Sequence, residues 1–422
     1  MIGTLDHRYR EATIVGAGIA GMLTAYALDK RGFRVTLLEQ KARAGGLIRT
    51  TRTEQGIAES AAHSLLVSEP VRELCRELGV QLVEPRKEAS AKFIMRDGHL
   101  VRFPLKLRET VSLAHHAAFN RSAHSGEQNV DAWAREHLGD SATDYLLTPF
   151  VRGIYGVQPS ELGIAAAFPF LNLPDGQTLL SALLHRIAKR VKGKSKKVRA
   201  APRFGMGDLV DRLEQHLEDH LGSRFRTNEK IAELPDAPNV ILATPAYAAA
   251  SLLQSPVPQL AEQLRTVRYT PIVSVTTFVE RNAFDHPIHG TGVLMPARED
   301  TKSLGILFNS SSFECRVADD SRFASFTVMM GGTAHPEWLD ASDDEIRQAI
   351  KFELSHVLGI REPHSTVIHR WPQALPQYSI DLPRVWQKAQ DSWCLIPGRM
   401  LVGNYTGQIS LRGMIESAAA LN

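Results

Sequence analysis

A glycine-rich turn between a predicted strand and a predicted helix constrains this chain most. Residues 12–15 are apolar, and the residues that follow have the spacing GxGxxG: Gly16, Ala17, Gly18, Ile19, Ala20 and Gly21. Gly16 allows a tight turn, Gly18 lets the backbone approach a pyrophosphate, and Gly21 allows close packing of helix on strand. The pattern predicts the start of a Rossmann-like dinucleotide-binding domain.

The residues after the second predicted strand (34–38) indicate which dinucleotide binds. Glu39 lies 21 residues beyond Gly18, where a carboxylate accepts hydrogen bonds from ribose hydroxyls. Residues 39–46 have the pattern E-x3-R-x-G-G, with Arg43, Gly45 and Gly46 at its fixed positions. This pattern resembles the second glycine motif of the FAD-dependent amine oxidase superfamily. A plain NAD dehydrogenase is the least favoured alternative.

Composition is typical of a globular protein, with 43% hydrophobic and 23% charged residues. Lys and Arg number 49 against 46 Asp and Glu, so net charge gives no argument for nucleic acid. Three scattered cysteines exclude a disulfide framework and a cysteine zinc site. The first ten residues lack a signal-peptide core, and no apolar run is long enough to span a bilayer, so we expect a cytoplasmic protein.

Hydrophobic patterning divides the rest of the chain into three kinds of region. Helices are predicted at 19–30, 68–78, 130–138, 141–150 and 342–358, the last with a capping box of Ser342 and Glu345 and a stop at Gly359. A second, antiparallel sheet is predicted from strands at 272–279, 303–308 and 324–329. The stretch 186–203 has nine Lys or Arg among eighteen residues, and we expect an exposed loop there.

Four stretches extend the resemblance to one family. They are residues 12–49, residues 129–133 with 148–156, residues 203–209, and residues 371–378 with 401–411. In these stretches the chain resembles the oxygen-dependent protoporphyrinogen oxidases and their relatives that oxidise coproporphyrinogen. The resemblance implies an α/β fold: a Rossmann-like FAD-binding domain (1–87, 204–265 and 366–422), a mixed-sheet α+β substrate domain (88–105 and 266–365) and a helical insertion (106–203).

The resemblance also implies site residues. FAD would be held by Gly16, Ala17, Gly18, Ile19, Ala20, Gly21, Glu39, Gln40, Arg43, Gly45, Gly46, Leu47, Ile231, Trp371, Gly403, Asn404 and Ile409. The helix carrying Ile409 is expected over 409–420. The implied reaction belongs to heme biosynthesis: a porphyrinogen, protoporphyrinogen IX or coproporphyrinogen III, loses hydride to the flavin and dioxygen reoxidises it. No metal is expected, and the one candidate catalytic residue is His63, as a proton carrier.

Several positions depart from the family. Lys92 stands where an arginine binds substrate carboxylates, so Arg96 and Arg102 are alternative cations. Ala61 replaces a glycine expected near the flavin edge. The segment 226–240 is short, which affects the adenine contacts near Ile231, and the chain ends at Asn422, about two helical turns before relatives usually end.

These departures leave alternatives open. The chain is either a porphyrinogen oxidase, another flavoenzyme of the superfamily acting on an amine or a polyene, or a non-catalytic flavin-binding relative. The basic stretch 186–203 is a solvated loop, a contact for acidic lipids, or a collector of anionic substrate. It lacks interleaved aromatic residues, so we do not expect nucleic acid as a partner. Self-association and peripheral membrane contact stay open.

Overall fold

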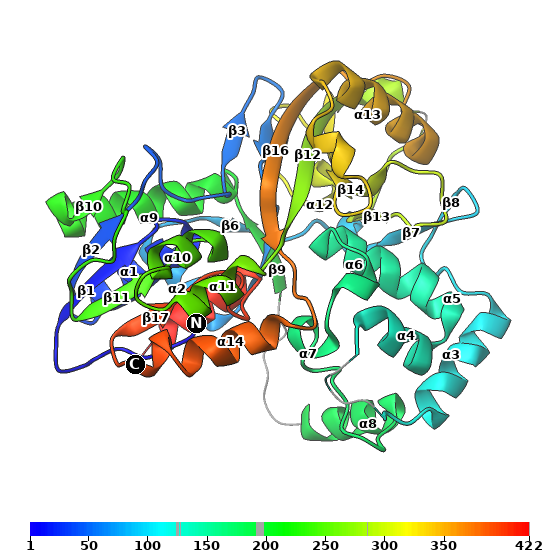
Figure 1. Ribbon diagram of the computed structural model, residues 1–422. Coiled ribbons are helices and arrows are strands. Elements are labelled where there is room, and N and C mark those ends of the chain that lie inside the picture. The colour runs from blue at the N-terminus through cyan, green and yellow to red at the C-terminus, as the bar shows by residue number, and fades with distance from the viewer. Residues whose placement is uncertain (124–125, 127, 191–197, 285, 422) are drawn as a thin grey trace.

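The computed structural model describes residues 1–123, 126, 128–190, 198–284 and 286–421. Two separate sheets and a helical region make up the fold (Figure 1). The first sheet lies at the left of the view, the second at the upper right, and the helices α3–α8 below the second.

The first sheet has five strands in the order β10-β2-β1-β11-β17, and every neighbouring pair is parallel. Its strands come from both ends and the middle of the chain, which agrees with a discontinuous Rossmann-like domain. Predicted strands at 12–15 and 34–38 are confirmed within one residue. The strands are β1 (Glu11–Val15), β2 (Arg34–Leu38), β10 (Phe225–Arg226), β11 (Asn239–Leu242) and β17 (Arg399–Leu401).

Helices cover both faces of this sheet. One face and its helices α1, α2, α9 and α15 form one apolar core, and the other face packs with α10, α11 and α14. α1 has the predicted bounds, and α15 starts at Leu411 because Ser410 caps it, not at Ile409. The bounds are α1 (Ile19–Lys30), α2 (Glu69–Glu77), α9 (Met206–Leu221), α10 (Ala246–Leu253), α11 (Pro258–Arg265), α14 (Leu382–Gln390) and α15 (Leu411–Ala419).

The second sheet has seven strands in the order β16-β12-β15-β14-β13-β7-β8. It is antiparallel except for the pair β13–β7, which is parallel. The three strands predicted for an antiparallel sheet correspond to β12, β14 and β15 and do pair antiparallel, and the parallel pair makes the whole sheet mixed, as the family resemblance implied. The strands are β7 (Phe93–Arg96), β8 (His99–Val101), β12 (Tyr269–Glu280), β13 (Gly292–Leu294), β14 (Ser303–Phe308), β15 (Phe323–Gly331) and β16 (Ser365–Pro376).

One face of the second sheet packs against α13 (Asp343–Leu358). The capping box predicted at its start is present: Ser342 Oγ accepts from the Glu345 amide at 3.3 Å, and the Glu345 carboxylate accepts from the Ser342 amide at 2.8 Å. Because side chains alternate along a strand, residues such as Val273, Val275 and Val328 face α13. The neighbouring residues face the other way, toward the first sheet's connections.

The helical region contains α3 (Leu107–Phe119), α4 (Val130–Leu138), α5 (Asp140–Ala142), α6 (Thr148–Tyr155), α7 (Ile164–Ala167) and α8 (Leu179–Arg190). The helix predicted at 141–150 is interrupted, since Thr143–Leu147 forms a π-helical turn, η2, between α5 and α6. No helix among the described residues is both long and apolar enough to cross a membrane.

The basic stretch 186–203 is not simply a loop, and that prediction was wrong at both ends. Its first part continues α8 to Arg190, and its last part forms β9 (Val198–Pro202). β9 pairs with β5 (Leu65–Val67) and β6 (Leu82–Val83), so it is held within a three-stranded sheet. The expectation for residues 191–197 lies outside the described residues.

The predicted domain limits stay predictions. β16 begins at Ser365 and runs in the second sheet to Pro376, beyond the limit expected at 366. The remaining elements are β3 (Thr50–Arg52), β4 (Ile57–Glu59), α12 (Asn309–Ser312), η1 (Lys87–Ser90), η3 (Pro159–Glu161), η4 (Gly222–Arg224), η5 (Arg281–Ala283), η6 (Pro336–Leu339) and η7 (Trp393–Leu395).

Candidate functional site

The turn between β1 and α1 has the geometry that its glycines predict. Gly16 adopts φ +102°, and a Cβ there would lie 2.7 Å from the Ala243 backbone oxygen. A Cβ on Gly21 would lie 1.9 Å from the Gly16 oxygen. A Cβ on Gly18, by contrast, would meet nothing within 4 Å. Gly16 and Gly21 are thus required by the fold, whereas Gly18 borders open space at the N-terminus of α1.

The second glycine pair lies directly beside the first turn. The Gly45 amide donates to the Ala17 oxygen at 2.8 Å, and a Cβ on Gly46 would lie 3.3 Å from the Gly18 Cα. Gly45 and Gly46 have φ values of +87° and +63°, which favour glycine. Arg43 steadies this loop through a 2.8 Å hydrogen bond from Nη2 to the Ile48 backbone oxygen.

Glu39 holds the edge of the same space. Its carboxylate accepts from the Ala17 amide at 2.8 Å and from the Lys41 amide at 2.9 Å. The short segment after β10 runs beside Glu39, since the Glu229 amide donates to the Glu39 backbone oxygen at 2.9 Å. Gln40 is exposed, and Ile231 packs partly buried against the core on the α10 side of the sheet.

The segment after β17 returns to this region. The Tyr378 hydroxyl donates to the Asn404 backbone oxygen. The Trp386 indole donates to the Tyr405 oxygen at 2.7 Å, and Gly403 adopts φ +156°. Ile409 is partly buried and precedes the Ser410 cap, while α15 packs against α1.

These parts fit a dinucleotide. The open space at Gly18 and the amides of the first turn of α1 suit a pyrophosphate. The carboxylate of Glu39 suits the hydroxyl groups of a ribose. Leu47 extends the second glycine loop, and its backbone oxygen accepts the Ser60 hydroxyl at 2.7 Å. The cofactor roles of the individual residues stay predictions.

The face of the second sheet that points away from α13 meets the segment 50–60 of the first domain. The Trp371 indole donates to the Ser60 oxygen at 2.7 Å, and Thr51 hydrogen-bonds His369 at 3.1 Å. This face is part polar and part apolar. It carries Ser274, Thr276, Thr327, Met329, His369 and Trp371.

A cavity of about 70 Å³ lies at one end of this face. Glu59 and Arg316 form a buried ion pair at its wall, with Oε1 and Nη1 3.4 Å apart. Burial raises the pKa of Glu59, although its carboxylate also accepts from the Thr50 hydroxyl and the Met206 amide. The lining further includes His63, Arg199, Thr291, Asn309, Ser312 and Phe313.

His63 lies in this cavity with its Nε2 shielded from solvent and without a hydrogen-bond partner in the described structure. Burial, together with the charges of Arg316 and His369, lowers the pKa of His63 to about 4. The imidazole is therefore neutral at pH 7. A neutral imidazole can donate or accept a hydrogen bond, and the role of His63 as a proton carrier stays a prediction.

The cations proposed for substrate carboxylates differ in their surroundings. Lys92 and Arg102 are exposed. Arg96 is buried, binds both Glu109 oxygens at 2.8 and 2.9 Å, and covers the Tyr145 ring at 4.0 Å. Arg96 is thus engaged structurally. Sequence analysis missed Arg199, which lines the cavity, because its strand lies in the stretch interpreted as a loop.

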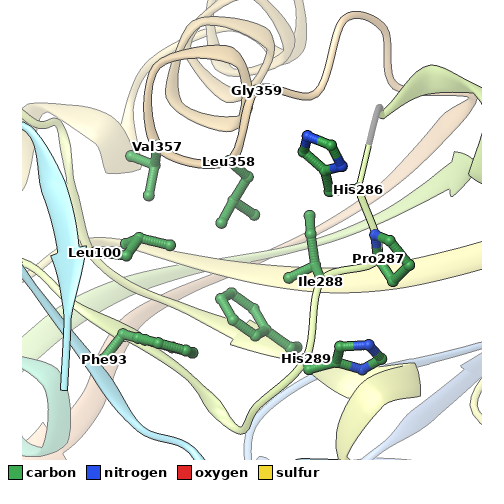
Figure 2. Close-up of a pocket in the computed structure, with 10 residues that line it drawn as sticks. Phe93, Leu100, His286, Pro287, Ile288, His289, Val357, Leu358 and Gly359 are labelled. Carbon is green, nitrogen blue, oxygen red and sulfur yellow. The ribbon is translucent and has the colours of Figure 1, made fainter.

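The position of Ala61, where the family has glycine, is half-buried beside Ser60. A larger cavity, about 300 Å³, lies elsewhere (Figure 2). The end of α13 faces β7, β8 and residues 286–289 across it, on the α13 side of the second sheet. It contains none of the predicted site residues.

One group of potential metal ligands lies on α1 and α9. Asp29, His216 and His220 each place a ligand atom within 4.8 Å of the others. The two imidazole rings are 4.0 Å apart and tilted by 31°, and His220 Nδ1 already bonds the Asp29 carboxylate at 2.9 Å. We assign no metal to this group.

Comparison with known proteins shows similarity to flavin-containing oxidoreductases along most of the chain. Residues 19–420 match the family described as flavin containing amine oxidoreductase. Protoporphyrinogen oxidase 2 of Arabidopsis thaliana is 27% identical over 97% of this chain and 92% of its own. Coproporphyrinogen III oxidase of Bacillus subtilis (strain 168) is 21% identical over 88% of each. A crystal structure from Exiguobacterium sp. 255-15 has a TM-score of 0.76 at 21% identity, covering 98% of both chains.

Proposed function

The chain belongs to the family of flavin-containing amine oxidoreductases, and we propose that it binds FAD and oxidises a porphyrinogen to the porphyrin, with dioxygen as final acceptor. The observation that carries the proposal is the similarity to a plant protoporphyrinogen oxidase along 97% of the chain. The mixed polar and apolar face beside the glycine turns supports it, since the substrate is an apolar macrocycle with carboxylate side chains.

Bound FAD would supply the hydride acceptor and the route by which two electrons reach dioxygen, giving hydrogen peroxide. The residues of this chain bind and orient. The amides at the start of α1 and Glu39 would hold pyrophosphate and ribose. Met329 and Trp371 offer apolar surface to the macrocycle, and His63 a neutral hydrogen-bonding group. Orientation and exclusion of water are thus the protein's contribution.

The test is an anaerobic titration. FAD-loaded protein is mixed with protoporphyrinogen IX while flavin absorbance is followed, and air is then admitted. We expect bleaching, followed by porphyrin fluorescence and peroxide. Coproporphyrinogen III in a parallel experiment ranks the two substrates. Flavin that stays oxidised with both porphyrinogens but bleaches with a primary amine would replace the proposal by an amine oxidase.

We also propose peripheral membrane contact through α8. Leu180, Leu183, Leu184 and Ile187 are exposed, and their spacing places them on one face of the helix. Apolar side chains on one exposed helical face favour the boundary of a lipid bilayer. Sedimentation with anionic vesicles tests this, and the variant Leu184→Glu should stay in solution. The cytoplasmic location expected from the sequence stays a prediction.

A further inference from the structure

We propose that Arg199, in the 70 Å³ cavity, binds a carboxylate of the substrate. This inference rests on the proposed function and assigns a binding residue to it. Arg199 lies on β9, whose pairing with β5 and β6 fixes the backbone on which the side chain is carried. The side chain therefore projects into the cavity from a paired strand.

The guanidinium of Arg199 uses little of its hydrogen-bonding capacity. Nη2 donates to the Thr291 hydroxyl at a long 3.3 Å, and the planar group lies over the Phe313 ring at 5.1 Å. Thr291 in turn donates to the Ala89 oxygen at 2.7 Å, which orients its hydroxyl oxygen toward Arg199. A guanidinium has five N–H donors, so most of them remain available to a ligand.

The charge of Arg199 is also uncompensated within the described part of the chain. No carboxylate there lies within ion-pair distance of it, whereas Arg316 pairs with Glu59 and Arg96 with Glu109. Burial lowers the pKa of Arg199, which reflects the cost of removing the cation from water. A planar, partly desolvated guanidinium with free donors is the group that binds carboxylates bidentately.

The remaining walls of the cavity favour an anion. Asn309, Ser312 and Thr291 supply polar groups, and His63 supplies a neutral ring nitrogen without a partner. Glu59, the acid in the lining, is held by Arg316, Thr50 and the Met206 amide. The two charges of that pair offset each other, so the net charge around the cavity is positive.

Size and position fit one arm of a larger substrate. A cavity of about 70 Å³ is small beside the pockets of about 300–1,000 Å³ that hold drug-sized ligands, so it has space for a carboxylate arm and not for a macrocycle. The Thr291 amide donates to the Ala91 oxygen at 2.7 Å, so the residue that Arg199 contacts is hydrogen-bonded to the backbone one residue before Lys92. Lys92 is exposed and does not line the cavity, so Arg199 supplies the planar donor group there.

The test compares an acid with its ester. Arg199→Met, Arg199→Lys and the control Arg203→Met, whose arginine pairs with Glu314 outside the cavity, are assayed with protoporphyrinogen IX and its dimethyl ester. We expect Arg199→Met to raise KM for the acid about tenfold or more, with kcat within about twofold. Wild type and Arg199→Met should have equal KM for the ester. Arg199→Lys should be intermediate, and Arg203→Met should equal wild type.

A second measurement separates failure of this inference from failure of the proposed function. Binding of protoporphyrin IX and its dimethyl ester to the oxidised holoprotein is followed by fluorescence quenching. Unchanged KM and Kd in Arg199→Met, or equal losses for acid and ester, would overturn the role of Arg199 while oxidation by wild type upholds the function. If the acid binds in an Arg199-dependent way but wild type does not oxidise the porphyrinogen, the role of Arg199 is upheld and the proposed function is overturned. Flavin content and thermal melting verify that each variant folds.

Discussion

The indole nitrogen of Trp371 donates a 2.7 Å hydrogen bond to the backbone oxygen of Ser60. Trp371 lies on β16 of the seven-stranded sheet, and Ser60 follows β4, in the segment that leads on from the second glycine loop. The bond from Thr51 to His369 runs beside it. Together they fix the distance between the seven-stranded sheet and the segment that leads on from the second glycine loop.

Trp371→Phe keeps an aromatic ring but leaves the Ser60 oxygen without its donor. We expect a loss of about 1–3 kcal/mol in the free energy of unfolding, measured by urea denaturation. Trp393→Phe is the matched control, because the buried Trp393 Nε1 has no partner in the described structure. The loss in the free energy of unfolding should be far smaller for Trp393→Phe than for Trp371→Phe. Equal losses for both variants would show that packing, and not the hydrogen bond, sets the cost.

Gly18→Ala and Gly21→Ala should separate cofactor binding from folding. Gly18 has φ −64° and open space around it, so alanine should leave the stability of the flavin-free protein within about 0.5 kcal/mol. Flavin content should nevertheless fall, because the methyl group occupies the approach of the pyrophosphate. Gly21→Ala places a Cβ 1.9 Å from the Gly16 oxygen and should destabilise the flavin-free protein by about 2 kcal/mol or more. Full flavin occupancy in purified Gly18→Ala would contradict the cofactor position.

His63 should make the protein less stable in mild acid. Its folded pKa of about 4 lies below the unfolded value of about 6.5, so the unfolded state binds more protons between these limits. Stability is then unaffected above about pH 6.5 and falls as pH drops toward 4. His63→Gln should remove about 2–3 kcal/mol of that loss, measured by denaturation at pH 7 and pH 4.5. The pH dependence of activity should be compared in wild type and His63→Gln. Any inflection near pH 6.5 in wild type should also be present in His63→Gln.

The buried pair of Glu59 and Arg316 gives a double-mutant prediction. Arg316→Met leaves the Glu59 carboxylate buried without its cation and should cost about 3–5 kcal/mol. Adding Glu59→Gln removes the uncompensated charge, so the double variant should be more stable than Arg316→Met alone. Denaturation of all four proteins measures the coupling. Additive losses would mean that the pair does not interact.

Arg96 and Lys92 should behave oppositely on substitution. Arg96→Met removes two hydrogen bonds to Glu109, so it should lower the melting temperature and release the Glu109 carboxyl from a pKa of about 2. Its KM for protoporphyrinogen IX should stay near that of wild type. Lys92→Met, at an exposed position, should raise KM without changing stability. A large KM effect in stable Arg96→Met would restore Arg96 as a substrate contact.

Local signals in the sequence predicted much of the fold. α1 has the predicted bounds because the glycine turn sets its start and its apolar residues continue to Lys30. The capping box at Ser342 and the left-handed Gly359 likewise set both ends of α13. The two glycine motifs, both recognised from the sequence, lie side by side, since Gly18 and Gly45 form a β-bridge. These features depend on neighbours in the sequence.

Features that depend on distant partners were missed. β9 is a strand because β5 and β6 pair with it from more than a hundred residues earlier, so its basic composition was misleading. Arg199 was overlooked for the same reason. The hydrogen bond between Thr51 and His369 and the ion pair between Arg96 and Glu109 also form only when the chain folds. Burial then decides that His63 is neutral, which no sequence spacing indicates.

The five-stranded sheet has a consequence for biogenesis. Its edge strand β17 lies near the end of the chain and pairs with β11, while Ile2 and Leu401 exchange two backbone hydrogen bonds of 2.9 Å. Because β17 is synthesised long after β1 and β2, the first sheet is complete only when residue 401 has left the ribosome. A nascent chain stalled before residue 399 lacks this edge strand, and we expect it to emerge colourless.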